Sequence, residues 1–221
     1  MPYVPLDEST WTGGLKPEDY FQSLATYKHL VLSLFREAEV AEEDRAAVVA
    51  CLPAAPAELR LVVVTEDWCG DSAAVLPYIT RLAETLAVPI RVFRQSRNSH
   101  LKQWYVEQGT DHIPVVSLLR LQETGEGGTP EEGAPDDGAE LAWRELMRWV
   151  ERPDAATERL GQWRAQQPRF DELYARRESD AEAAKEYAGL YARLLRAMAS
   201  WYRGGLWREI PREWCAALEH A

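Results

Sequence analysis

The sequence contains little cysteine or histidine, and these few residues are scattered. Its three cysteines, Cys51, Cys69 and Cys215, are too few and too far apart for a disulfide framework. Neither the cysteines nor the four histidines occur at the spacing of metal ligands, so we expect no metal and no cofactor. Scarce, unpaired cysteine is typical of proteins in a reducing compartment, which predicts a cytoplasmic location.

Positive charge and long apolar runs are also scarce. The 25 Lys and Arg residues are outnumbered by 36 Asp and Glu residues, which gives a net charge of −11. Nucleic acids and anionic membrane surfaces require clustered positive charge, so neither is an expected partner. No apolar run approaches the roughly 20 residues that span a bilayer. Residues 1–8 also lack the basic and apolar regions of a signal peptide.

The chain divides by pattern into three parts. Residues 1–56 are predicted to form a helical N-terminal extension that packs on the core. One helix of this extension starts at Pro17, because five apolar residues fall on one helical face: Tyr20, Leu24, Tyr27, Val31 and Leu34. A second helix is expected from about Ala41 to Cys51, before Pro53.

Residues 57–153 alternate between strand and helix. The pattern predicts strands at 61–64, 90–94 and 115–119, and helices at 72–86 and from Asn98 or Ser99 to Gly109. Residues 123–139 are rich in Gly, Pro and acidic residues, which indicates a long exposed loop. Residues 141–150 alternate as in a strand, although a helix remains possible there.

Residues 154–221 are predicted to form a helical C-terminal extension. Asp154 can cap one helix, and Ser179 with Glu182 predicts a capping box for another that ends at Gly204–Gly205. Pro211 can start a short last helix. Four tryptophans of this extension are expected in the core: Trp163, Trp201, Trp207 and Trp214.

The stretch Thr-Glu-Asp-Trp-Cys-Gly-Asp-Ser-Ala, residues 65–73, places Cys69 between a predicted strand and a predicted helix. Unpaired N–H groups and the helix dipole stabilise a thiolate at such a position, and a hydrogen bond from Ser72 adds to this. The nearby acids Glu66, Asp67 and Asp71 act in the opposite direction, so the net pKa shift of the thiol stays open. We expect Cys69 to be exposed and to be the most reactive of the three thiols.

These residues resemble the thioredoxin superfamily, and the similarity is strongest to bacterial thioredoxin-like proteins with a Glu-Asp-Trp-Cys-Gly-Asp corner. Trp68-Cys69-Gly70 follows a strand as in the family's Trp-Cys-Gly corner, Pro77 lies where the family kinks the active-site helix, and Ile113-Pro114 precedes a strand where the family has its cis-proline. The strand, helix and Ile-Pro segments also follow in thioredoxin order. The resemblance implies an α/β thioredoxin-like fold with a central mixed sheet flanked by helices.

The same resemblance implies roles for individual residues. Cys69 would be the nucleophile and Ser72 its hydrogen-bonding neighbour. An extended substrate segment would lie along the backbone of Ile113, in the manner of strand addition. The residues implied in substrate binding are Trp68, Gly70, Asp71, Ile113 and Pro114.

Three positions depart from the dithiol enzymes of the superfamily. Ser72 replaces the second cysteine, Asp71 replaces a proline, and Val63 replaces a buried aspartate that relays protons. We therefore predict a monothiol thiol–disulfide oxidoreductase that acts on protein or low-molecular-weight disulfides. The alternative is a redox-inactive thioredoxin-fold module that binds a protein partner.

The sequence also gives expectations for four residues outside the predicted nucleophile. His112 could donate a proton near the sulfur, although an exposed loop histidine is the simpler interpretation. Asp71 could instead be the N-cap of the helix. Cys51 and Cys215 are expected to be small buried hydrophobic side chains. The sequence leaves the oligomeric state open.

Overall fold

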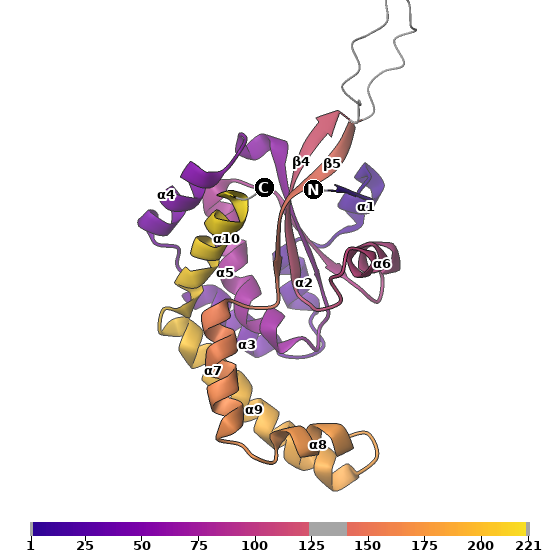
Figure 1. Ribbon diagram of the computed structural model, residues 1–221, viewed down its shortest axis with the longest axis vertical. Helices are drawn as coiled ribbons and strands as arrows, with labels where there is room; N and C mark the ends of the chain where they lie inside the picture. The colour runs from indigo at the N-terminus through magenta and orange to yellow at the C-terminus, as the bar shows by residue number, and fades with distance from the viewer. Residues whose placement is uncertain (1, 124–140, 220–221) are drawn as a thin grey trace, which may run out of the picture.

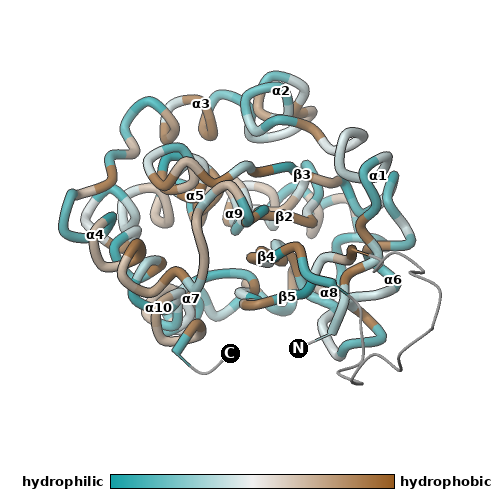
Figure 2. The backbone as a smooth tube through the Cα atoms, turned by 90° about the horizontal axis from the view of Figure 1, so that it is seen from above, coloured by the Kyte–Doolittle hydropathy of each residue, from teal (hydrophilic) through white to brown (hydrophobic). Residues whose placement is uncertain are grey.

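A computed structural model of the chain describes residues 2–123 and 141–219. Its centre is a five-stranded mixed sheet in the order β1-β5-β4-β2-β3, in which β2 and β3 are parallel and the other pairs are antiparallel. The strands are β1 (Tyr3–Val4), β2 (Leu59–Thr65), β3 (Ile90–Arg94), β4 (Val115–Glu123) and β5 (Leu141–Val150). Helices cover both faces of the sheet (Figures 1 and 2). This arrangement confirms the predicted fold class.

The strands predicted at 61–64, 90–94 and 115–119 form as β2, β3 and β4, because each of these segments is short and mainly apolar. The alternating segment 141–150 is strand β5, not a helix, and it pairs with β4 along its length. The predicted loop between these two strands falls almost entirely on residues 124–140, outside the described part of the chain. Only Glu123 of that stretch is described, as the last residue of β4.

The helices of the central part are α5 (Gly70–Leu86) and α6 (Ser99–Glu107). Helix α5 contains Pro77 and is buried along most of its length, because it lies between the sheet and helices from both ends of the chain. Val63 of β2 and Met147 of β5 belong to the same large core as α5. A second, smaller core lies on the opposite face of the sheet, where α6 packs with the first residues of the chain.

The N-terminal part contains α1 (Glu8–Gly13), α2 (Pro17–Ser23), α3 (Lys28–Glu37) and α4 (Glu42–Cys51). The single helix predicted from Pro17 to Leu34 is wrong, because the chain turns between α2 and α3 and Tyr27 adopts a left-handed conformation with φ 58°. Long-range hydrogen bonds hold this turn: the Ala25 N–H donates to the Asp67 carboxylate and the Thr26 hydroxyl donates to the Asp67 carbonyl. Periodicity cannot reveal such a break, since its cause lies elsewhere in the sequence.

The C-terminal part contains α7 (Asp154–Ala165), α8 (Phe170–Arg176), α9 (Ala181–Arg203) and α10 (Glu209–Glu219). The predicted capping box at Ser179 is wrong, because the Asp180 carboxylate accepts hydrogen bonds from the N–H groups of Glu182 and Ala183 instead. Pro153, not Asp154, occupies the N-cap position of α7. Pro211 lies in the first turn of α10, which begins two residues earlier than predicted.

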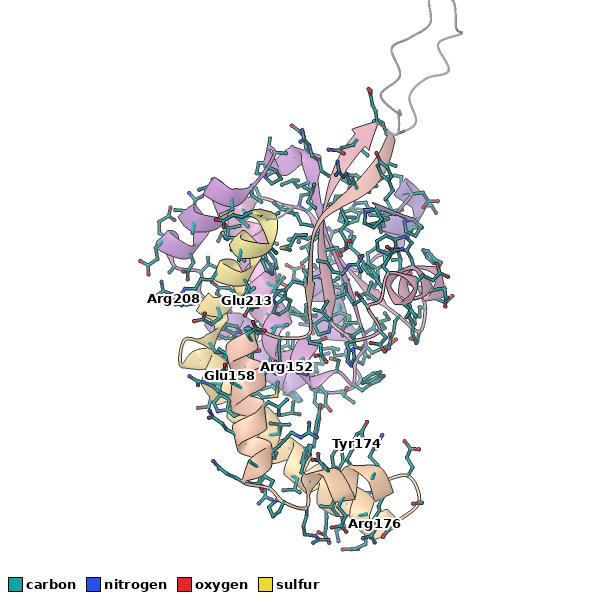
Figure 3. The ribbon with its side chains drawn as sticks, viewed as in Figure 1. Arg152, Glu158, Tyr174, Arg176, Arg208 and Glu213 are labelled. Atoms are coloured by element: carbon teal, nitrogen blue, oxygen red, sulfur yellow. The ribbon has the colours of Figure 1, made fainter. Side chains whose placement is uncertain are left out.

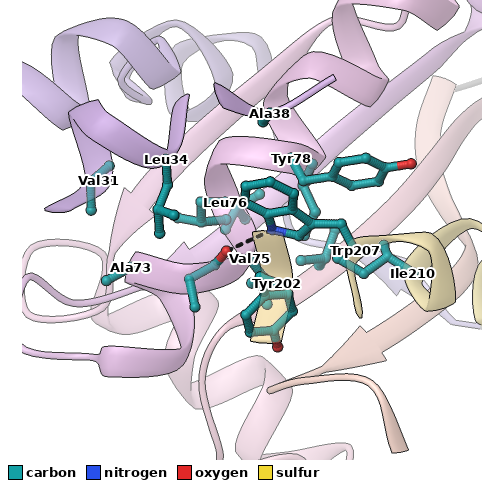
Figure 4. Packing of buried hydrophobic residues seen from close by; sticks show 14 of the residues in the cluster. Val31, Leu34, Ala38, Ala73, Val75, Leu76, Tyr78, Tyr202, Trp207 and Ile210 are labelled. Atoms are coloured by element: carbon teal, nitrogen blue, oxygen red, sulfur yellow. Dashed lines mark hydrogen bonds between the residues drawn. The ribbon is translucent and has the colours of Figure 1, made fainter. Parts of the chain in front are cut away.

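Aromatic contacts attach the C-terminal helices to α5. The indole of Trp207 stacks on Tyr78 with ring centroids 5.8 Å apart, and its N–H donates to the Ala74 carbonyl at 2.9 Å (Figure 4). Trp207 and Trp214 are buried as predicted, whereas Trp163 and Trp201 are partly buried at the edge of the core. The helical extensions thus share one core with the sheet.

A carboxylate joins α10 to the start of α7. Glu213 of α10 accepts one hydrogen bond from the Trp149 indole and one from the Asp154 N–H, both at 2.7 Å. Figure 3 shows Glu213 and Arg152 in this region, where β5 ends and α7 begins. Helix α10 is therefore connected both to the end of β5 and to the start of α7.

Candidate active site around Cys69

Cys69 lies at the corner between β2 and α5 and is the N-cap of that helix. Its extended backbone, φ −76° and ψ 113°, turns the sulfur toward the first helical turn, where the Ser72 N–H donates to Sγ at 3.5 Å. The Cys69 N–H in turn donates to the Glu66 carbonyl at 3.1 Å, which closes the corner. Because Cys69 occupies the cap, Asp71 is not the N-cap, contrary to that alternative.

The sulfur also meets the segment before β4. The Cys69 thiol donates to the Ile113 carbonyl at 3.4 Å, and the peptide bond between Ile113 and Pro114 is cis. Two segments that are 44 residues apart in the sequence thus meet at this sulfur. The structure brings together Cys69, Ser72, Ile113 and Pro114 of the residues predicted for the site.

Ser72 is buried, and its hydroxyl forms a hydrogen bond with the Thr65 hydroxyl at the end of β2. Ser72 thus makes two contacts at the corner: its backbone N–H donates to the sulfur, and its hydroxyl is hydrogen-bonded to β2. Val63, in the position of the family's buried aspartate, is fully buried in β2. This apolar side chain cannot accept or release a proton.

The expected exposure of Cys69 is wrong, because only 7% of the residue is accessible to solvent. The turn between α2 and α3 covers the sulfur from one side, and Thr26, Tyr27 and Val31 line a small hollow with it. Tyr191 of α9 closes the neighbouring position: a methyl group added to Gly70 would lie 2.4 Å from its hydroxyl. The ring of Tyr27, which lines that hollow, lies beside the ring of Tyr191, with centroids 6.3 Å apart. We call these two residues the tyrosine cover.

Burial decides the ionisation of the thiol. It raises the pKa of Cys69 above the ordinary cysteine value, and the hydrogen bonds from the Ser72 hydroxyl and N–H oppose this without cancelling it. The carboxylate of Asp71 raises the pKa further, whereas the Asp71 N–H lowers it. Desolvation of the thiol therefore outweighs the hydrogen bonds that it accepts from the start of α5.

The three acidic residues at the corner each have a partner. Asp71 forms two hydrogen bonds of 2.6 Å with Arg152, and Asp67 forms an ion pair of 2.6 Å with Arg94. Glu66 is buried and accepts from the Ser96 N–H at 2.6 Å. These carboxylates therefore bind the corner to the segments that contain Arg152, Arg94 and Ser96.

Two residues considered for the site, Trp68 and His112, are exposed to solvent. Trp68 is 58% exposed, so its ring presents an apolar surface to solvent next to the site. His112 is also exposed, and its imidazole pairs with Asp111 at 2.5 Å and not with the thiol. The interpretation of His112 as an exposed loop residue holds.

Sequence reasoning missed Tyr27, Tyr191 and Arg152 as parts of the site. Tyr27 was expected within a helix, and Tyr191 belongs to an amphipathic helix whose apolar residues have an ordinary packing pattern. Arg152 follows a strand, and its ion pair with the adjacent Glu151 gives no indication of its contact with Asp71. No motif in the sequence connects these three residues with Cys69.

Comparison with known proteins agrees with this geometry. The thioredoxin family matches residues 14–166 of the chain, well over half of its length. The chain belongs to the thioredoxin superfamily. No curated protein matches it.

Two solved structures share the thioredoxin-like fold of the chain. A protein of unknown function from Pseudomonas aeruginosa has a TM-score of 0.56 and 15% identity, over 97% of this chain and 98% of the other. An HIV epitope-scaffold has a TM-score of 0.52 and 15% identity, over 94% of each chain. Because both alignments cover nearly whole chains, the similarity in fold includes the helices before and after the thioredoxin core.

Among residues 2–123 and 141–219, no helix is both long enough and apolar enough to cross a membrane. The same residues contain no group of three or more His, Cys, Asp and Glu side chains arranged to hold a metal ion.

Proposed function

We propose that this thioredoxin-like protein carries out thiol–disulfide exchange through Cys69 alone. The observation that carries the proposal is the position of the sulfur, which contacts both the Ser72 N–H at the start of α5 and the Ile113 carbonyl beside a cis-proline. A thiol at a helix N-terminus next to an extended backbone segment is arranged to meet a disulfide that pairs with that backbone. Proteins and small molecules containing disulfides are the proposed substrates.

The reaction begins with loss of the thiol proton that Cys69 shares with the Ile113 carbonyl. The thiolate attacks one sulfur of the substrate disulfide, forms a mixed disulfide with it and releases the other sulfur as a thiol after protonation. The Ser72 N–H, which donates to Sγ, stabilises the negative charge before attack. Residue 72 has no sulfur, so a second thiol from solution must attack the mixed disulfide to regenerate Cys69.

The proposed reaction requires the tyrosine cover to open. A substrate sulfur reaches Cys69 only when Tyr27 and Tyr191 move from the corner, because the residue is 7% exposed in the closed arrangement. Opening also returns water to the thiol and removes the main cause of its raised pKa. Access and activation are therefore coupled in the proposed cycle.

A second function has its own support. The buried thiol with its raised pKa, together with Ser72 and Val63, favours a redox-inactive module that binds a protein partner. The exposed ring of Trp68 beside the corner would then belong to the binding surface. In this alternative Cys69 is a packing residue.

Reaction with glutathione disulfide separates the two functions. We would use the Cys51→Ser, Cys215→Ser protein, in which Cys69 is the remaining thiol, and its Cys69→Ala derivative as the matched control. The proposal predicts one glutathione adduct on Cys69 in the folded protein, removed by added thiol, and none in the control. The binding module is supported instead if the folded protein forms the Cys69 adduct no faster than an ordinary exposed thiol reacts with glutathione disulfide. The same protein should then reduce no protein disulfide.

A further inference from the structure

The other two cysteines lie next to each other in the fold. Cys51 is the last residue of α4 and Cys215 lies within α10, and these two helices pack side by side (Figure 1). The Cys215 thiol donates to the Ala47 carbonyl at 3.5 Å, and Ala47 lies one helical turn before Cys51. Cys51 and Cys215 line the same cavity, and the Cys51 thiol lies near enough to raise the pKa of Cys215. Residues from opposite ends of the chain thus place two sulfurs together.

Neither thiol is enclosed. Both cysteines are free and only partly buried, contrary to the expectation that they are buried packing residues. They line an open cavity of about 430 Å³ together with Ala47, Arg212 and Ala216. A small molecule in solution can therefore approach this pair, whereas Cys69 lies beneath the tyrosine cover.

We propose that Cys51 and Cys215 form a second, dithiol site that a low-molecular-weight disulfide oxidises to an intramolecular disulfide. One protein thiolate attacks the small disulfide, which gives a mixed disulfide and one released thiol. The other protein thiolate then attacks the protein sulfur of the mixed disulfide, closes the bond between residues 51 and 215 and releases a second thiol. The two cysteines lose two electrons and two protons, and the small disulfide gains both.

Burial and the neighbouring Cys51 thiol raise the pKa of Cys215. One sulfur of the pair makes the first attack, and the other loses its proton during ring closure. The resulting disulfide would join α4 to α10, and hence the N-terminal helices to the C-terminal helices.

The cross-link would restrict the unfolded chain over the long segment between residues 51 and 215. Because a closed loop lowers the entropy of the unfolded state, the oxidised protein should unfold at a higher temperature than the reduced protein. This stabilisation does not depend on any activity of Cys69. It provides a readout that a pair of merely adjacent thiols would not show.

The test oxidises the folded, full-length protein with glutathione disulfide, blocks the remaining thiols and maps peptides without reduction. We expect a peptide pair joined through residues 51 and 215, Cys69 outside that bond, and a melting temperature that rises on oxidation and falls again with added thiol. Cys51→Ser and Cys215→Ser should each lose the cross-link and the shift. Cys69→Ser, the matched control, should keep both.

Two results would overturn the proposal. One is wild-type protein that stays folded and, after full reaction with the oxidant, yields no peptide pair joined through 51 and 215. The other is a cross-link that forms while the melting temperature of the oxidised wild type stays equal to that of the reduced wild type. Both measurements on the wild type stand even if a serine variant fails to fold.

Discussion

Asp71 and Arg152 form a two-bonded ion pair at the start of α5, with Nε to Oδ1 and Nη2 to Oδ2 each 2.6 Å apart. Both side chains are largely buried, with 16% of Asp71 and 14% of Arg152 exposed. The pair joins the helix that carries Cys69 to the connection between β5 and α7. It also keeps a negative charge near the thiol, where that charge raises the pKa of Cys69.

Asp71→Asn tests both consequences of this pair. The substitution leaves the largely buried guanidinium of Arg152 with Glu151, 3.3 Å away, as its remaining carboxylate partner, and we expect a loss of about 1–3 kcal/mol in the free energy of unfolding, measured in urea. The pKa of Cys69 should fall, since one of its raising causes is removed. Asp171→Asn is the control, because its partner Arg164 is 46% exposed and such surface pairs contribute about 0–1 kcal/mol. Equal losses in the two variants would contradict the prediction.

The raised pKa of Cys69 predicts a pH dependence of its alkylation. The thiolate is the reacting form, so the rate increases with pH until the pH exceeds the thiol pKa. In the Cys51→Ser, Cys215→Ser protein, the rate with iodoacetamide should still be rising above pH 9, the ordinary value for cysteine. Site-resolved mass spectrometry measures it. A plateau near neutral pH would show that the helix N-terminus outweighs burial.

Removing the tyrosine cover should expose the thiol. In the same two-serine background, Tyr191→Ala and Tyr27→Ala should each raise the alkylation rate of Cys69 several-fold at neutral pH, because each substitution opens one side of the corner. Tyr174→Ala is the control, since that residue is 49% exposed on α8 and does not line the hollow at Cys69. The same acceleration in all three variants would mean that general loosening, not the cover, controls access.

Ser72→Cys should create a disulfide with Cys69. The Ser72 nitrogen already lies 3.5 Å from Sγ, and the backbone of Cys69 at the helix entrance is extended and not helical, as a disulfide over this short spacing requires. Mild oxidation should yield a bond between residues 69 and 72 and a weak dithiol reductase activity, weak because Val63 cannot relay protons.

Peptide mapping of the oxidised Ser72→Cys variant reads out the bond. Ser72→Ala is the control: it removes the hydrogen bond to the Thr65 hydroxyl without adding a sulfur. If both thiols of the folded Ser72→Cys variant remain free, Cys69 does not occupy the corner described here.

The sequence by itself determined the order of strands and helices in the thioredoxin core and the position of Cys69 between β2 and α5. These features depend on signals that are local in the chain: a short β-branched run, a Gly after the cysteine, and an Ile-Pro before the next strand. The alternation of apolar and polar residues over 141–150 also predicted the strand that is β5. Local patterns of this kind are sufficient because each element forms from neighbouring residues.

Only the tertiary structure decided how the thiol is surrounded. From the two helical extensions, Tyr27 lies beside Cys69 and Tyr191 lies against Gly70, while Arg152 reaches Asp71 from the end of β5. Cys51 and Cys215 likewise meet because α4 and α10 pack together. Burial, and hence the pKa of a thiol, depends on atoms brought close in space by the folded chain, and the periodicity of a single segment contains no information about which distant segment will cover it.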